Sequence, residues 1–104
     1  MFEIHRMPAE DDRFTMVMHE GEKILGITSA KIIDNVAHLE FIDEFVPNVA
    51  LIMGKAILNS IDLAGYKNVE TDIKDMDNVL KALKFKEENG VLKLNLEGYF
   101  TSGC

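Results

Sequence analysis

The sequence predicts an α+β fold with one mixed, mostly antiparallel sheet, and three observations support this prediction. Residues 2–46 contain four runs of alternating apolar and polar side chains, separated by short polar turns, as in an antiparallel meander. Residues 49–64 repeat apolar side chains with helical spacing. Near the end of the chain, an Asn89-Gly90 pair lies between two short apolar runs, which is typical of a β-hairpin.

The expected elements follow the order strand–strand–strand–strand–helix–strand–helix–strand–strand, and residues 1–104 are expected to form a single domain. Strands are expected at 2–7, 14–19, 23–33, 36–46, 66–73, 85–88 and 91–97, and helices at 49–64 and 75–83. Pro47 near the start of the first helix and Gly65 after its end are usual helix boundaries. The two strands that flank this helix should be parallel, because crossover connections of this length join parallel strands.

The first helix carries the residues on which the functional interpretation depends. Its apolar residues share one helical face, at positions 49, 52, 53, 56, 57, 61 and 64. Gly54 and Ala56 are expected in its first turn, where small residues let a ligand phosphate approach unpaired N–H groups. On spacing alone, the preferred interpretation is that these residues only allow close packing against the sheet, because short glycine motifs often match by chance.

The charge balance excludes some classes of partner. Eighteen acidic and eleven basic residues give a formal net charge of −7, without any basic run, so nucleic acid and anionic membrane surfaces are not expected partners. Neither a transmembrane run nor a signal peptide is visible. The single Cys104 favours a reducing, cytoplasmic location. Three scattered histidines give no metal-ligand spacing, so no metal is expected.

The stretch Leu51-Ile52-Met53-Gly54-Lys55-Ala56 is similar to a motif of the GNAT superfamily, the acyl-CoA-dependent N-acetyltransferases. That motif is Gln/Arg-x-x-Gly-x-Gly/Ala at the start of the central helix; Gly54 and Ala56 match it, and Leu51 departs from it. The resemblance implies acetyl-CoA as co-substrate, with its pyrophosphate on backbone N–H groups of this stretch. The cofactor-binding residues that it implies are Phe45, Val46, Leu51, Met53, Gly54, Lys55 and Ala56.

Two further positions bear on catalysis within this resemblance. Residues 80–87 resemble the family's Tyr-x-x-x-Gly-Phe segment, in which Phe85 matches but Leu80 replaces the tyrosine that protonates the leaving thiolate. Glu40 falls where some members place a glutamate as general base, and a carboxylate suits that role. The alternative is that Glu40 is a solvated strand residue, on one face with Ile42 and Glu44.

The resemblance also implies a protein trimmed at its front. Residues 8–13 are too few for the two helices that the family usually has between its first two strands. Apolar rows on the second and third strands, at Phe14, Met16 and Met18 and at Ile24, Ile27 and Ile33, would then need cover. A two-fold homodimer is therefore expected, unless Tyr99 and Phe100 fold back over the gap.

Two functions follow from these features. The first is transfer of an acyl group from acetyl-CoA to a small-molecule or peptide amine. An acidic surface could attract such an amine, but the preferred interpretation of the acidic balance is ordinary solubility. The second is a catalytically inactive GNAT-like domain that binds CoA or another protein, because a fold alone does not decide activity.

Overall fold

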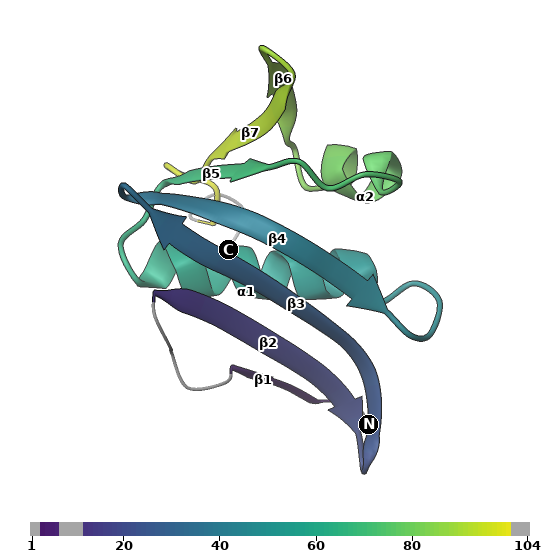
Figure 1. Cartoon of the computed structure of the whole chain (residues 1–104). Helices are drawn as coiled ribbons and strands as arrows, with labels where there is room; N and C mark the ends of the chain where they lie inside the picture. The colour runs from purple at the N-terminus through teal and green to yellow at the C-terminus, as the bar shows by residue number, and fades with distance from the viewer. Residues whose placement is uncertain (1–2, 7–11, 101–104) are drawn as a thin grey trace.

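Seven strands and two helices make up the part of the chain that the computed structural model describes, residues 3–6 and 12–100 (Figure 1). The strands are β1 (Glu3–Arg6), β2 (Arg13–Glu20), β3 (Lys23–Ile33), β4 (Val36–Glu44), β5 (Asn68–Thr71), β6 (Lys86–Glu88) and β7 (Val91–Asn95). The helices are α1 (Ala50–Leu63) and α2 (Asp77–Ala82). The predicted α+β class and element order are confirmed. The largest boundary changes remove two residues from the end of β4, from both ends of β5, from the end of β7 and from the start of α2. The predictions for Phe2, Met7, residues 8–11 and Cys104 concern residues outside the described part of the chain.

All seven strands form one mixed sheet in the order β1-β2-β3-β4-β5-β7-β6. β1 to β4 are antiparallel neighbours, and β4 pairs in parallel with β5 after the α1 crossover, as predicted. β7 then pairs antiparallel with both β5 and β6. Among the described residues, no helix is long and apolar enough to cross a membrane.

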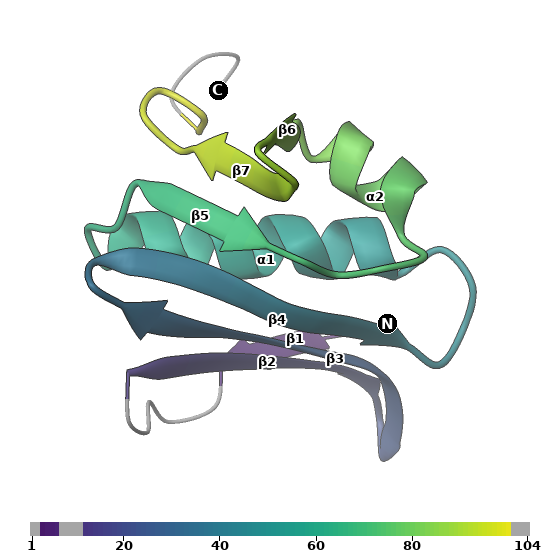
Figure 2. The same ribbon diagram turned by 45° about the horizontal axis from the view of Figure 1, so that its top comes forward.

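Helix α1 covers one face of β2, β3 and β4 (Figures 1 and 2). The alternate β2 residues Phe14, Met16 and Met18 are buried in the core that α1 closes. The expectation that this row needs cover from a second copy is therefore wrong, because α1 already covers it. Tyr99 and Phe100 also pack against the core, but the Tyr99 hydroxyl bonds to Leu83 at the end of α2, and their expected position over the β2 and β3 rows stays a prediction.

The buried face of α1 differs from the predicted one. It consists of Ala50, Met53, Gly54, Ile57, Leu58, Ser60 and Ile61, while the side chain of Ile52 is 41% exposed. The face is shifted because α1 contacts α2 as well as the sheet. A Cβ atom on Gly54 would lie only 2.6 Å from Cδ1 of Leu83, the residue that ends α2. Gly54 thus permits close packing, and its partner is α2 rather than the sheet.

A β-bulge interrupts β4 at Glu40. Ala30 pairs with Leu39, and the preceding Ser29 pairs with Phe41, so Glu40 is the extra residue. Side-chain alternation shifts at this point, and Glu40 and Phe41 are consecutive exposed residues. The expectation that Glu40 and Ile42 share a face is wrong for this reason, because Ile42 is buried.

Candidate functional site

The two parallel strands of the sheet separate after a short paired region. β4 and β5 pair from Val36 and Asn68 to Leu39 and Thr71. β4 then continues to Glu44, while the chain after Thr71 turns away toward α2 (Figure 2). Ligand sites commonly lie beyond the carboxyl ends of parallel strands, so this fork is the natural place to search for one.

Thr71 fastens the fork at the point where the strands separate. Its hydroxyl donates a hydrogen bond to the Leu39 carbonyl oxygen at 2.8 Å. The same hydroxyl oxygen accepts a hydrogen bond from the Ile73 N–H at 3.2 Å. Thr71 is only 4% exposed, and it therefore joins β4 to the first residues of the diverging segment.

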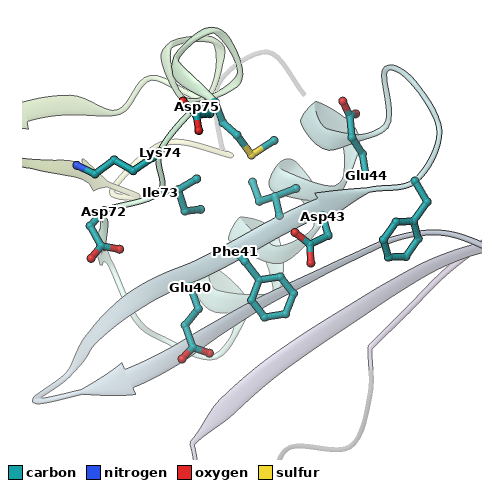
Figure 3. A pocket seen from close by; sticks show the side chains of 11 residues that line it. Glu40, Phe41, Asp43, Glu44, Asp72, Ile73, Lys74 and Asp75 are labelled. Atoms are coloured by element: carbon teal, nitrogen blue, oxygen red, sulfur yellow. The ribbon is translucent and has the colours of Figure 1, made fainter.

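A cleft of about 540 Å³ lies between the two arms of the fork (Figure 3). Residues 40–45 of β4 and the following loop line one side, and residues 72–76 line the other. A second cavity of about 500 Å³ adjoins it, and Glu44, Asp75 and Met76 line both. The volume of each cavity is in the usual range for small-molecule sites.

The cleft has an acidic lining. Its ionisable side chains are one lysine, Lys74, and five carboxylates, namely Glu40, Asp43, Glu44, Asp72 and Asp75. A concave surface with carboxylates in excess attracts cations and repels anions. The cleft is thus electrostatically suited to a cationic amine, and the carboxylates are its candidate proton acceptors.

Glu40, the predicted general base, lies in this lining and is held by two side chains. Nε and Nη2 of Arg13 donate hydrogen bonds to its Oε1 and Oε2 at 2.9 and 3.2 Å. The Ser29 hydroxyl donates a third hydrogen bond to Oε1 at 3.2 Å. Both carboxylate oxygens are therefore engaged, but three hydrogen bonds leave one of the carboxylate's about four lone pairs, on Oε2, for a substrate proton.

The start of α1 already holds an anion from the chain itself. Oε2 of Glu44 accepts hydrogen bonds from the N–H groups of Val49 and Ala50, at 3.2 and 3.0 Å. A carboxylate at this position satisfies unpaired donors and interacts favourably with the helix dipole. A phosphate that used the same donors would have to displace Glu44.

The predicted cofactor-binding residues occupy two environments. Phe45 is 57% exposed and Lys55 is exposed, while Val46, Leu51 and Ala56 are half-buried. Met53 and Gly54 are buried. The placement of Gly54 in the first turn is wrong, because α1 begins at Ala50 and the Met53 N–H already donates to the Val49 carbonyl. The N–H groups from Met53 to Ala56 thus belong to the hydrogen-bonded part of the helix.

No tyrosine is among the residues that line the cleft in the described part of the chain. Leu80, at the position of the family's tyrosine, is 1% exposed in the core. The Tyr99 hydroxyl donates a hydrogen bond to the Leu83 carbonyl at 2.9 Å. Burial raises the pKa of Tyr99 above its usual value, which keeps this hydroxyl protonated in that bond.

Sequence reasoning missed several residues that the fold brings together. Arg13, Ser29 and Thr71 act on β4 from positions distant in sequence, and local patterns contain no signal for such contacts. Glu3, His5 and His19 also lie together on β1 and β2. The Glu-x-His alternation within β1 was visible, but its pairing with His19 depends on strand register.

No family model matches the sequence, and a search of curated protein sequences also finds no match. Comparison with solved structures does find similar folds. The ribosomal-protein-S18-alanine N-acetyltransferase from Escherichia coli superimposes with a TM-score of 0.77 at 8% identity, over 91% of this chain and 94% of that chain. An acetyltransferase from Bacillus subtilis in complex with CoA superimposes with a TM-score of 0.75 at 9% identity. This match covers 92% of this chain and 99% of that chain.

PaiA N-acetyltransferase from Thermoplasma acidophilum, in complex with coenzyme A, gives a TM-score of 0.64 at 12% identity. The match covers 81% of this chain and spans 61% of the length of PaiA. Sequence identities this low relate the folds alone. The described residues thus share the fold of these solved acetyltransferases, a mixed seven-stranded sheet that forks where β4 and β5 separate. More specifically, it is the GNAT fold, as the two sequence motifs predicted.

Proposed function

We propose that this protein transfers an acyl group from acetyl-CoA to a cationic amine in the cleft between the arms of the β4–β5 fork. The observation that carries the proposal is the acidic lining of that cleft in a chain with the GNAT fold. Solved neighbours in complex with CoA support the choice of co-substrate. The acceptor is a small molecule or a peptide, because the open cleft suits either.

Glu40 is the proposed general base. The amine nitrogen attacks the thioester carbonyl carbon, the C–S bond breaks, and CoA leaves as a thiolate. Before the attack, Glu40 takes one proton from the ammonium, on the lone pair that its contacts with Arg13 and Ser29 leave unused. The nitrogen loses its second proton as the amide forms, and water relays that proton to the thiolate, because Leu80 has no ionisable group.

The proposed CoA surface lies at the start of α1, beside the cleft. Phe45, Val46, Leu51 and Ala56 offer apolar contacts, and Lys55 offers a cation for phosphate. Met53 and Gly54 support this surface from the core side. The pyrophosphate competes with Glu44 for the N–H groups of Val49 and Ala50.

A catalytically inactive GNAT-like domain is the second candidate. Three observations favour it: Glu44 fills the start of α1, Arg13 engages both oxygens of Glu40, and Leu80 is buried. Such a domain would bind CoA or a protein without turnover.

The proposed protein is a cytoplasmic homodimer. The apolar row on β2 no longer supports the dimer, because α1 covers that row. The exposed apolar side chain of Leu63, the last residue of α1 and outside the cleft lining, remains for a second copy to cover. Ile24 and Ile33 do not form one patch with each other, because about 30 Å of β3 separates them. Sedimentation at micromolar concentration tests the dimer, which a monomer of 11.7 kDa would contradict.

Thermal melting with acetyl-CoA and with CoA tests cofactor binding. A ligand that binds only the folded state stabilises it by about 2.7 kcal/mol at 100 times its Kd. We expect Lys55→Glu to lose most of this stabilisation, while Lys23→Glu, an equal charge change at the distant first residue of β3, keeps it. An unchanged melting temperature in the wild type would remove acetyl-CoA from the proposal.

Turnover separates the two candidates. The wild type is incubated with acetyl-CoA and a panel of cationic amines. A CoA-release assay, and mass spectrometry of the acylated amine, should then detect activity. Glu40→Gln should lower kcat/KM by about 10²- to 10⁴-fold, the usual contribution of a general base. Saturable CoA binding without turnover on any amine would favour the inactive domain.

A further inference from the structure

Three metal-ligating side chains meet on the β1–β2 pair, away from the cleft. Glu3 pairs directly with His19, and His5 pairs with Val17 two residues further along β1. Residues two apart on a strand share a face, so Glu3, His5 and His19 project on the same side. His19 is six residues from Arg13 along β2, or about 20 Å, and the cluster is therefore separate from the proposed acyltransferase site.

The donor atoms of this cluster are close together. One donor atom from each of the three residues lies within 4.8 Å of the others, and Nε2 of His5 lies 3.9 Å from Oε1 of Glu3. The two imidazole rings are stacked, with centroids 4.8 Å apart and planes inclined by 16°. Donors bound to a tetrahedral zinc ion at about 2.0–2.1 Å lie about 3.3 Å apart. The exposed side chains of Glu3 and His5 can close the remaining gap by small rotations.

His19 is already held in a tautomer that suits metal binding. Its Nδ1 lies 3.0 Å from the Gly21 carbonyl oxygen. A carbonyl oxygen only accepts hydrogen bonds, so Nδ1 carries the proton in this contact. The neutral ring then has its lone pair on Nε2. Metal-ligating histidines are commonly oriented by this kind of contact through their other ring nitrogen.

We propose that Glu3, His5 and His19 bind a divalent transition-metal ion of the zinc class, with water in the remaining coordination position. Two imidazoles and one carboxylate match the ligand preferences of Zn²⁺. Mg²⁺ prefers sites made of oxygen atoms alone. Because the ligands come from two strands, the ion would fasten the edge strand β1 to β2.

Titration calorimetry with Zn²⁺, on protein stripped with a chelator, tests the site. We expect one ion per chain in the wild type. His5→Ala and His19→Ala should each weaken binding by about tenfold or more, because loss of an outer contact to a ligand alone costs about 10- to 100-fold. His38→Ala is the matched control. His38 also lies beside a carboxylate, with its Nδ1 3.8 Å from Oε2 of Glu70, but it is outside the cluster. Cys104→Ser controls for the single thiol.

Several outcomes would overturn the proposal. These are the absence of Zn²⁺ binding in the wild type, an equal loss in His38→Ala or Cys104→Ser, and displacement of Zn²⁺ by an equal concentration of Mg²⁺. A second measurement avoids substitutions altogether. In the wild type, Zn²⁺ should shift the imidazole NMR signals of His5 and His19 and leave those of His38 in place, and the reverse pattern would also overturn the proposal.

Discussion

The two faces of the sheet differ in what their residues do. On the face that α1 covers, β2 contributes Phe14, Met16 and Met18, all buried. On the opposite face, which no helix covers in Figure 1, the intervening β2 residues are more polar and more exposed; they include Arg13, which pairs with Glu40, and His19. Neighbouring residues of one strand therefore have separate tasks, one stabilising the fold and the other presenting chemical groups to solvent.

The largest expected effect is on the covered face. Met18→Ala should destabilise the protein by about 2–5 kcal/mol, because Met18 is fully buried and truncation leaves a cavity. Val17→Ala, one residue away on the opposite face and half-buried, should cost about 1 kcal/mol or less. Urea unfolding of both variants measures the difference, and equal costs would contradict the assignment of the two faces.

The next effect concerns the fork. Thr71→Val should destabilise by about 1–3 kcal/mol, because it leaves the buried Leu39 carbonyl and the Ile73 N–H without the hydroxyl. Thr15→Val, on the open face, should change stability by less. Hydrogen exchange at Ile73 should also accelerate in Thr71→Val, and unchanged protection there would show that the hydroxyl does not fasten the fork.

Removal of the carboxylate at the start of α1 should have opposite effects on stability and binding. Glu44→Ala should lower the free energy of unfolding by about 0.5–2 kcal/mol, as for the loss of a helix cap. It should tighten acetyl-CoA binding, because a competing anion is gone. Glu22→Ala, in the β2–β3 turn, serves as the charge-matched control. Calorimetry that finds weaker binding in Glu44→Ala than in this control would place the phosphates elsewhere.

The smallest expected effect is at the end of the core. Tyr99→Phe should cost about 0.5–1.5 kcal/mol at neutral pH, through the hydrogen bond to Leu83. Because burial raises the pKa of Tyr99 above 10.0 in the folded state, the wild type binds this proton more tightly when folded. Its advantage over Tyr99→Phe should therefore be full below pH 10 and decline at higher pH. Unfolding curves from pH 8 to 11 measure this, and a constant difference would contradict it.

The parts of the fold that were predictable from sequence are those with local signals. Alternation located the strands of the meander, Asn89-Gly90 located the last hairpin, and the crossover length implied the parallel pair. The bulge at Glu40 and the bond from Thr71 to Leu39 had no local signal, because both depend on register between strands.

The candidate site was predicted only in part for the same reason. The family resemblance pointed to Glu40, which does line the cleft. It could not reveal that Arg13, 27 residues earlier, binds Glu40, or that Glu44 caps α1. Gly54 illustrates the limit of a short motif, since its contact with Leu83 explains the glycine by packing alone.

The most direct test of the proposed function is an amide NMR titration of the wild-type protein with acetyl-CoA. The proposed function predicts saturable shifts at the fork and the start of α1, including Phe45, Leu51 and Ile73. The amide signals of β1 and the adjoining part of β2, at the far edge of the sheet, should not shift. Saturable shifts confined to other elements, or no shifts at millimolar acetyl-CoA, would contradict a cofactor site at the fork.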